Sequence, residues 1–387
     1  MLQLENIQDK LAGWRLWMLF GGLFALAAGL RLYELSADPP NHFANLGQAL
    51  LTDPYHITAH ARNKVLFGQW EPFGYERWVA FKVSLVSALA YVVFSLSEVS
   101  RYTANLTAVI LNLCGAVFLA AGIYRSSSND NDRNNLAFSA LVAGALLALS
   151  HPLVVYGRAP FLENGLLALA GAAFYVTVVH GRTIKGAALA GALVALCPLA
   201  GKMFGVLLLF PAALTLALSG GQWTKRVGAF AASAALTAAL WYVFVLSDQT
   251  AAYHAYLNEQ SFGLYGTPPG LISLETFVVL LVTYGAEFRL FRFEALLPAL
   301  AFVGILSFTF KHKAEIWKNN CVFWKDRPAL TFLVLWVAAS WLGLMVFHYR
   351  PMRYSLFVLL PLIGAISMMV GDALSSRQVQ KKTSAAV

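Results

Sequence analysis

The segment "LTDPYHITAHARNKVLFGQW", Leu51 to Trp70, contains a carboxylate, two histidines and two cations in a chain that is otherwise strongly apolar. Asp53 is followed by Pro54, a typical helix start, because Asp accepts backbone N–H bonds at the N-cap and Pro suits the first helical position. The sequence therefore predicts a helix cap at Asp53 and leaves a functional role for this carboxylate open.

The polar residues after Asp53 recur at a spacing of four, which predicts an amphipathic helix that lies on the membrane. His56, His60 and Lys64 would form its polar face, and Ile57, Ala61 and Val65 its apolar face. His56 and His60 also have the spacing of two metal ligands. Without a third ligand they do not indicate a metal site, and metal dependence stays open.

A second acid lies in "HPLVVYGRAPFLENG", where Arg158 and Glu163 stand between two apolar runs. One interpretation is a short solvated loop with an ion pair. The other is a functional pair, because ionisable groups so close to the membrane are usually paired or functional. With Asp53 at the same face, two acids would meet several cations.

The cations near apolar runs suggest an anionic substrate. Each one taken alone suits a lysine or arginine whose charged end reaches the membrane interface. Taken together they can clamp a phosphate, with arginine offering a bidentate fork. A lipid phosphate is the natural candidate at a bilayer surface. The residues concerned are Lys82, Arg101, Arg158, Lys202, Arg350 and Arg353.

The elements that must position these residues are membrane helices. Of 387 residues, 59% are hydrophobic and 12% are charged, whereas soluble domains carry about 25% charged residues. The net charge of +9 comes from cations scattered among short loops, so nucleic-acid binding is not expected. Three distant cysteines indicate neither a disulfide framework nor a zinc site.

Hydropathy predicts an all-α polytopic membrane protein with about 10 spans, at most 12, because a span needs about 17 to 25 apolar residues. The first apolar run is expected to be retained as a membrane helix, not cleaved as a signal peptide. Two runs, 80–97 and 272–287, are ambiguous and are expected to lie along the interface. The expected spans are 13–32, 103–123, 137–156, 164–180, 186–200, 203–219, 228–247, 294–310, 328–347 and 354–371.

The positive-inside rule then places both termini in the cytoplasm, since a majority of Lys and Arg fall in the loops of that side. The expected organisation is a single membrane domain, 1–387, with a first outer loop at 33–102 and a second at 248–293. Residues 372–387 would form a cytoplasmic tail. Long loops are uncommon unless they are functional, so both outer loops are candidates for substrate contacts.

Four short motifs follow one another along the chain: "TDPYHITAHARNKVLFGQW", "VSRYTANLTA", "YGRAPFLENGLLALAGAAFYV" and "RPMRYSLFVLLP". In this order they resemble the polyprenyl-phosphate-sugar-dependent glycosyltransferases of the GT-C fold. They are similar above all to protein O-mannosyltransferases and the lipid A aminoarabinose transferase, that is, to glycosyltransferase family 39. The family usually has Asp-Glu at the first-loop acid, where this chain has Asp53-Pro54.

The resemblance implies transfer of a sugar from a polyprenyl-phosphate donor to a hydroxyl acceptor on a protein, lipid or glycan. Asp53 would be the general base, Arg158 and Glu163 the second acidic-loop pair, and Lys82 a phosphate ligand. Arg350 and Arg353 would help to stabilise the departing phosphate, and a single displacement would invert the anomeric centre. No cofactor is implied.

Further substrate contacts are expected from Tyr55 and His56 beside Asp53. Aromatic side chains of the outer loops can stack on sugar faces or anchor the chain at the interface. They are Tyr55, Trp70, Tyr75, Trp78, Tyr253 and Tyr256.

The expected location is a bacterial inner membrane, with the site on the outer, periplasmic face. A lipid-linked sugar flippase or another transporter is the main alternative, and a catalytically inactive scaffold is a third. A transporter would place its ionisable residues at mid-membrane on broken helices. Asp53, Glu163, Lys202 and Arg353 stand at the ends of apolar runs, which favours a reaction at the surface.

Overall fold

The protein is described from a computed structural model covering residues 14–37, 49–72, 82–126, 130–247, 250–251, 303–313, 324–345 and 352–384. Within these ranges the chain is helical, without a strand, which confirms the all-α expectation. Residues 303–313 are also helical. The other elements are α2 (Trp14–Leu32), η1 (Leu35–Ala37), α3 (Ala49–Phe67), α5 (Leu85–Leu96), α6 (Arg101–Arg125), α7 (Asp130–Leu149), α8 (His151–Gly157), α9 (Leu162–His180), α10 (Ile184–Leu196), η4 (Cys197–Gly201), η5 (Met203–Leu208), α11 (Leu209–Leu218), α12 (Trp223–Trp241), η6 (Tyr242–Leu246), α18 (Pro328–Met345), η9 (Met352–Ser355) and α19 (Leu356–Ser384).

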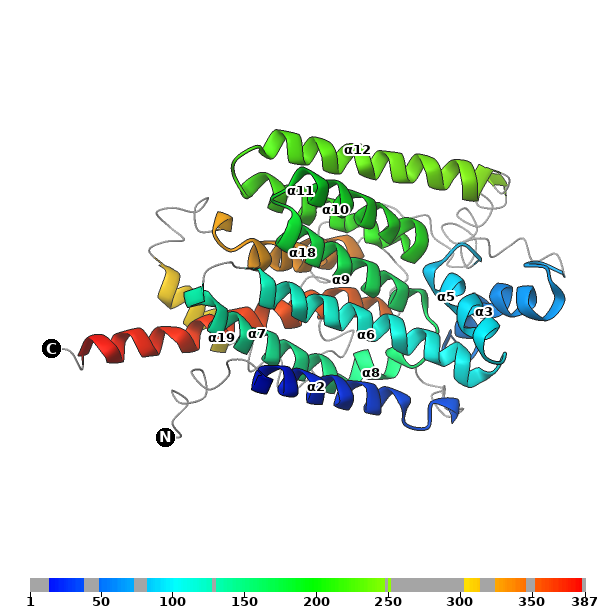
Figure 1. Ribbon diagram of the computed structural model, residues 1–387, viewed down its shortest axis with the longest axis horizontal. Helices are drawn as coiled ribbons and strands as arrows, with labels where there is room; N and C mark the ends of the chain where they lie inside the picture. Colours follow the sequence, from blue (N-terminus) through cyan, green and yellow to red (C-terminus); the bar gives the residue numbers. More distant parts are fainter. Residues whose placement is uncertain are drawn as a thin grey trace.

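The long helices form a bundle in which successive helices run in opposite directions (Figure 1). α6 starts beside α3 and α5 and runs toward the end where the chain terminates, α7 returns from that end toward α8, and α9 starts again beside α5. We call the end that carries α3, α5 and the start of α9 the site end. The other end, where α9 ends and α10 begins, is called the opposite end.

The centre of the bundle is built on α6 and α9, whose backbones approach each other closely. A Cβ atom on Gly171 would lie 2.7 Å from the Gly115 carbonyl oxygen, and one on Gly115 would lie 2.8 Å from the Leu167 carbonyl oxygen. Small residues allow such close packing between membrane helices. α9 is the most enclosed candidate span, with 83% of its apolar window buried.

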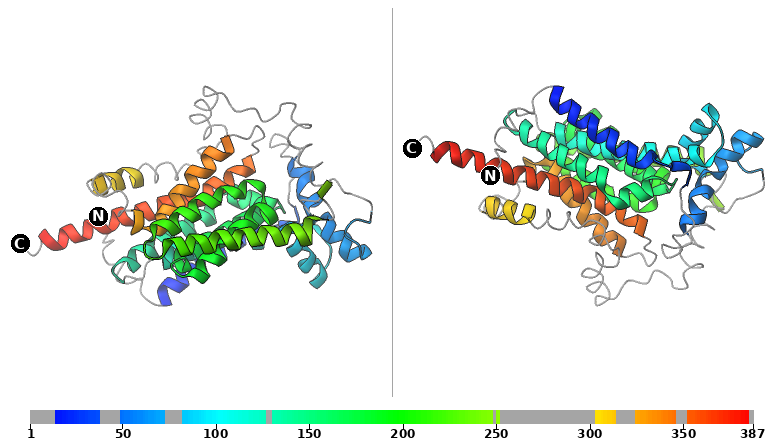
Figure 2. Two further views of the ribbon diagram at one scale, coloured as in Figure 1. Left: turned by 90° about the horizontal axis from the view of Figure 1, so that it is seen from above. Right: turned by 90° about the horizontal axis from the view of Figure 1, so that it is seen from below.

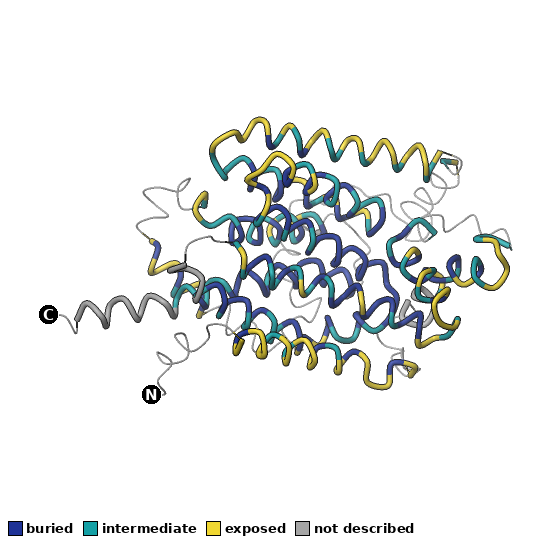
Figure 3. Tube along the Cα trace, in the orientation of Figure 1, coloured by how far each residue is buried: buried dark blue, intermediate teal, exposed yellow. Residues whose placement is uncertain are grey.

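Two helices at the periphery expose apolar side chains along most of their length. Only 6% of the apolar window around α12 and 11% of that around α2 are buried within the protein, and Figure 3 shows both helices largely exposed. Exposed apolar surface on this scale indicates contact with lipid. This pattern agrees with a multi-pass membrane protein.

Six helices in the described part of the chain are long and apolar enough to cross a membrane. The number becomes seven if α7 and α8, bent by 59° at Ser150, are one span. The other runs expected to span coincide with shorter apolar helices, such as Met203–Leu218 and Pro328–Leu344, or extend beyond the described residues. The expected number of about 10 is therefore neither confirmed nor excluded.

Helices α3 and α5 lie together beyond the bundle at the site end (Figure 2). α5 has 12 residues, a length of about 18 Å at the α-helical rise, which is too short to cross a bilayer. Ile57 of α3 packs in one apolar cluster with Val86 of α5 and Leu162 of α9. The interfacial helices expected in the first loop are thus packed against the start of α9.

The predicted start of α3 was wrong. The helix begins at Ala49, so Asp53 lies inside its second turn and is not the N-cap. The predicted faces are correct for Ile57 and Ala61, which are buried, but His60 is buried as well. A helix packed on two sides, against α5 and against the segment at Trp70, has no simple polar face.

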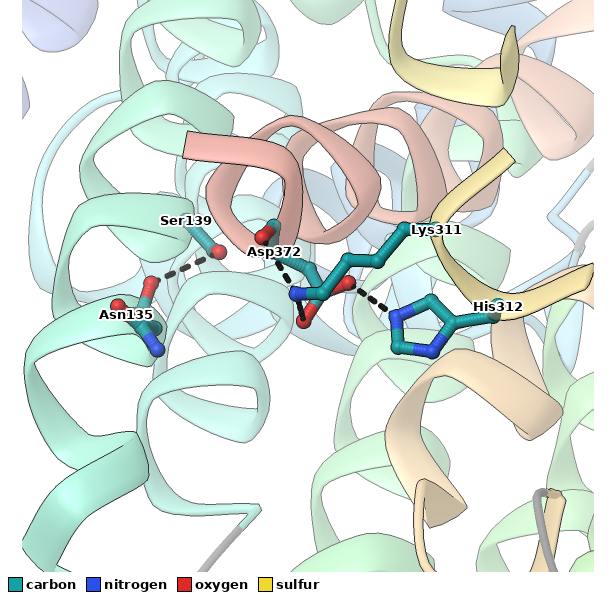
Figure 4. Close-up of polar contacts among 5 residues, drawn as sticks. All are labelled: Asn135, Ser139, Lys311, His312 and Asp372. Carbon is teal, nitrogen blue, oxygen red and sulfur yellow. Dashed lines mark hydrogen bonds and ion pairs between the residues drawn. The ribbon is translucent and has the colours of Figure 1, made fainter. Parts of the chain in front are cut away.

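A polar cluster joins helices at the opposite end (Figure 4). Asp372 of α19 accepts hydrogen bonds from Lys311 Nζ at 3.0 Å and contacts His312 Nε2 at 2.6 Å. Ser139 of α7 lies beside α19 in the same view and donates to the Asn135 carbonyl oxygen at 2.9 Å. These contacts connect 303–313 with α19 far from the residues that the sequence singled out.

Candidate functional site

Glu163 lies in the first turn of α9 and is almost fully buried, with 2% of its surface exposed. The helix starts after Phe161, whose side chain makes no capping hydrogen bond. A carboxylate in the first turn is favoured by the positive end of the helix dipole. This accounts for an acid at this position, but its burial requires charged partners.

Two cations from distant parts of the chain supply those partners. Lys202 Nζ lies 3.6 Å and Arg353 Nε 3.3 Å from Glu163 Oε1. Lys202 has an extended backbone between η4 and η5, and Arg353 lies in η9, just before α19. The start of α9, the break between η4 and η5, and η9 thus bring one carboxylate and two cations together at the site end.

Aromatic rings enclose this group, which we call the Glu163 cluster and define as Glu163, Lys202 and Arg353. Lys202 Nζ lies 4.9 Å from the ring centre of Tyr354, and Arg353 lies over Phe161 at 5.2 Å. Phe204 packs against Tyr354 with ring centres 5.0 Å apart. Cation–π contacts of this kind stabilise the positive charges in a partly dehydrated site.

The Glu163 cluster carries more positive than negative charge. One carboxylate faces two cations, and Glu163 Oε1 accepts no hydrogen bond from the described residues. The side chain of Lys202 is 21% exposed, whereas those of Arg353 and Glu163 are 7% and 3% exposed. An incoming anion would therefore meet Lys202 first, and the surplus charge would attract it.

A buried hydrogen-bond network fixes the start of α9, and no motif singled out in the sequence includes it. Arg31 Nε donates to Asn112 Oδ1 at 2.9 Å, and Asn112 Nδ2 donates to Asn164 Oδ1 at 3.0 Å. Asn164 Nδ2 in turn donates to the carbonyl oxygens of Tyr156 and Ala159. The network fixes the residue next to Glu163 to α2, α6 and the turn after α8. The sequence contained one signal for this network, namely the amide side chains at positions 112 and 164 inside apolar spans, because polar groups within a membrane usually have partners there.

Lys82 takes part in a second charged group, between α3 and α5. Its Nζ lies 3.2 Å from Glu71 Oε1, and His60 Nδ1 lies 3.9 Å from the same oxygen. His60 Nδ1 is also 3.4 Å from the Trp70 carbonyl oxygen. The sequence had singled out Lys82 but not Glu71, because nothing in the spacing shows that the two meet.

The other expected site residues are distributed as follows. Arg101 lies over the Tyr55 ring at 5.9 Å, and the Tyr55 hydroxyl donates to Asn105 at 3.4 Å. His56 is exposed. Arg158 does not pair with Glu163; it donates to the carbonyl oxygens of Leu30 and Glu34, at 3.0 and 3.3 Å. Its guanidinium thus links the turn after α8 to the end of α2.

Some expected residues lie outside the described part of the chain. They are Arg350, the side chain of Asp53, whose backbone lies in α3, the aromatic residues Tyr75, Trp78, Tyr253 and Tyr256, and almost all of the expected second outer loop, 248–293. Asp53 precedes Ile57 by one helical turn, and Ile57 shares an apolar cluster with Leu162, the neighbour of Glu163. The backbone of Asp53 is therefore at the site end, the same end as Glu163.

Among the described residues, no group of three or more His, Cys, Asp or Glu side chains is close enough together to hold a metal ion. Comparisons with family models, with curated proteins and with solved structures gave no match. The resemblance to glycosyltransferases therefore depends on the sequence motifs alone. The structure contributes the geometry and the surplus positive charge of the Glu163 cluster.

Proposed function

We propose that the chain is a membrane glycosyltransferase that moves a sugar from a polyprenyl phosphate to a hydroxyl acceptor. The observation that supports this most strongly is the convergence of Lys202 and Arg353 on buried Glu163. A surplus of positive charge beside aromatic rings suits the phosphate of a lipid donor. The acceptor, a hydroxyl group of a protein, lipid or glycan, would approach from the α3–α5 side.

In the proposed reaction, the acceptor oxygen forms a bond to the anomeric carbon while the bond from that carbon to the phosphate oxygen breaks. The electron pair of the broken bond stays on the polyprenyl phosphate, where Lys202 and Arg353 stabilise the new negative charge. The acceptor proton passes to Asp53. Glu163 would act as a positioning residue by holding the two cations, and a single displacement inverts the anomeric centre.

Lys82, Arg101 and Arg350 remain candidates for donor binding. Lys82 is paired with Glu71, so it would have to exchange or share that partner when a phosphate arrives. Tyr55, with Arg101 over its ring, offers an aromatic face to a sugar. We propose that α3 and α5 cover the donor and hold the acceptor at the outer face of a bacterial inner membrane.

The test is sugar transfer by the purified protein in detergent, with a radiolabelled polyprenyl-phosphate sugar and a panel of hydroxyl acceptors. We expect Lys202→Gln and Arg353→Gln each to lower the transfer rate by about 100-fold, the usual effect of removing one group that stabilises developing charge. Asp53→Asn should abolish transfer. Lys185→Gln removes the same charge at the opposite end and should leave the rate unchanged.

Full activity of Asp53→Asn would exclude Asp53 as the base. Equal losses in Lys185→Gln and Lys202→Gln would show that the total charge matters and not the Glu163 cluster. Thermal unfolding of each variant separates loss of chemistry from loss of fold.

A lipid-linked sugar flippase is the second candidate, and broken helices beside the site favour it. Lys202 lies between the π-helical η4 and the 3-10 helix η5, and α8 is bent by 59° from α7. Transporters often bind anions at such breaks. Reconstitution in vesicles with a fluorescent lipid-linked sugar distinguishes the two, since a flippase moves the lipid across the bilayer without transferring its sugar.

A further inference from the structure

A surface hollow of about 530 Å³ lies at the opposite end of the bundle, away from the Glu163 cluster. It is formed where the turn between α9 and α10 meets the turn between α11 and α12. The residues used in the argument are Arg182, Thr183, Gly220, Gly221, Gln222 and Arg226. None of them belongs to the site proposed above.

Arg226 is the main reason to assign a ligand to this hollow. It is only 4% exposed, and one of its terminal nitrogens donates to the Gly220 carbonyl oxygen. Its Nε is buried and has no hydrogen-bond partner among the described residues. A buried charged donor without a partner is unfavourable, so an anion that accepts a hydrogen bond from this nitrogen would stabilise it.

The hollow contains a second arginine and no counter-ion. The charge of Arg182 acts unfavourably on Arg226, and neither arginine forms an ion pair within the described part of the chain. The sequence contains no Asp or Glu from Asn164 to Ser247. Two cations that repel each other in one hollow are stabilised when an anion binds between them.

The backbone adds further donors. α12 starts at Trp223, whose N–H donates to the Gly221 carbonyl oxygen, and its N-cap Gln222 makes no side-chain capping hydrogen bond, so the next N–H groups of the first turn are not capped by Gln222. The turn before it has Gly220 and Gly221 at φ values of +73° and +61°, which other residues rarely adopt. Helix N-termini attract anions, and phosphate in particular.

The position in the bundle indicates where the anion would come from. α10 and α12 belong to candidate spans, and α12 exposes its apolar side chains as a lipid-facing helix does. Trp223, half exposed at the start of α12, suits the membrane interface. A hollow at this level lies among lipid headgroups.

We propose that this hollow binds a phosphate group, held by Arg182, Arg226 and the first turn of α12. A phosphate can accept the Arg226 Nε–H and a bidentate pair from Arg182. The geometry favours the headgroup of an anionic phospholipid as the source, and free phosphate has the same chemistry. Binding there would join the α9–α10 turn to the α11–α12 turn.

The experiment measures binding of short-chain phosphatidic acid, phosphatidylcholine and inorganic phosphate to the purified full chain, by native mass spectrometry and thermal shift. Arg182→Gln and Arg226→Gln should each weaken phosphatidic acid binding by about tenfold or more, the usual size for a charge-assisted hydrogen bond. Lys185→Gln and Lys225→Gln are matched controls, because both lysines are exposed at the same end outside the hollow. They should change the affinity by less than about twofold.

The proposal would be overturned if all four variants lost the same amount of affinity for phosphatidic acid, or if neither arginine variant lost any. Arg182 is exposed, so Arg182→Gln should fold even if Arg226→Gln does not. If inorganic phosphate stabilises the wild type as well as the lipid does, and with the same dependence on the arginines, the source is free phosphate. If only the lipid does, the source is a headgroup.

Discussion

Arg353 Nε lies 3.3 Å from Glu163 Oε1, although Glu163 is in the first turn of α9 and Arg353 is in η9, far away in the sequence. Both side chains are nearly buried, so their charges are poorly solvated by water. Lys202, the third member of the cluster, is more exposed and contacts the same carboxylate oxygen. The stability of this end of the bundle should therefore depend unequally on the two cations.

Arg353→Gln should lower the free energy of unfolding by about 3–5 kcal/mol, as expected when one partner of a buried pair is removed. Lys202→Gln should cost less, about 1 kcal/mol, because solvent screens a partly exposed pair. Chemical denaturation in detergent, followed by tryptophan fluorescence, measures both. Similar costs for the two variants would show that exposure does not separate their contributions.

The Arg31–Asn112–Asn164 network gives a second prediction. Asn112→Leu removes the acceptor of Arg31 Nε and the donor to Asn164, so a buried guanidinium nitrogen and a buried amide oxygen lose their partners. The free energy of unfolding should fall by about 2–4 kcal/mol, at about 1–3 kcal/mol per group left unpaired.

Sugar transfer should also fall in Asn112→Leu, since the network fixes the residue next to Glu163. Thr107→Val is a useful comparison, because Thr107 is buried in the same helix and donates to the Thr103 carbonyl oxygen, outside this network. If Thr107→Val lowers transfer as much as Asn112→Leu at equal stability, the network has no special role in the site.

Hydropathy predicted much of the fold, because the apolar runs of this chain coincide with helices wherever the structure describes them. The starts of α9 and α19 also follow the sequence, with Glu163 and Arg353 close to the starts of apolar runs, but α19 continues to Ser384, beyond the expected span 354–371. The start of α3 did not follow it. Asp53-Pro54 has the local chemistry of a helix start, yet α3 begins at Ala49.

Most partners of the charged residues could not be predicted from the sequence. Ion pairs such as Glu71–Lys82 depend on which loops the packing of α3 and α5 brings together, and no periodicity encodes that. Arg31 stands at the end of an apolar run, and nothing in the sequence shows that it is 1% exposed and bonded to α6. The sequence suggested that Glu163, Lys202 and Arg353 lie on the same side of the membrane. It did not show that Lys202 and Arg353 are the cations that contact Glu163.

The close contact between α6 and α9 gives a third prediction. Gly171→Ala would place a Cβ atom 2.7 Å from the Gly115 carbonyl oxygen, which forces the two backbones apart. The free energy of unfolding should fall by about 1–3 kcal/mol, the usual cost of overpacking. Gly228→Ala is the control, since nothing lies within 4 Å of its added atom. That variant should be neutral or more stable by up to about 1 kcal/mol, from helix propensity.

Thermal unfolding midpoints of both glycine variants in the same detergent provide the measurement. A stable Gly171→Ala protein would mean that the α6–α9 contact can widen without loss.

The last prediction concerns the two ends of the bundle. Ser97, after α5, is at the site end, and Lys185, in the first turn of α10, is at the opposite end; both are exposed. Three membrane crossings separate them if α6, the bent pair α7–α8 and α9 each span. In a protein whose three cysteines are replaced by alanine, Ser97→Cys and Lys185→Cys should therefore react with a membrane-impermeant maleimide from opposite sides of sealed vesicles. If the positive-inside expectation holds, intact cells label only Ser97→Cys, whereas labelling of both positions from one side would require a different set of spans.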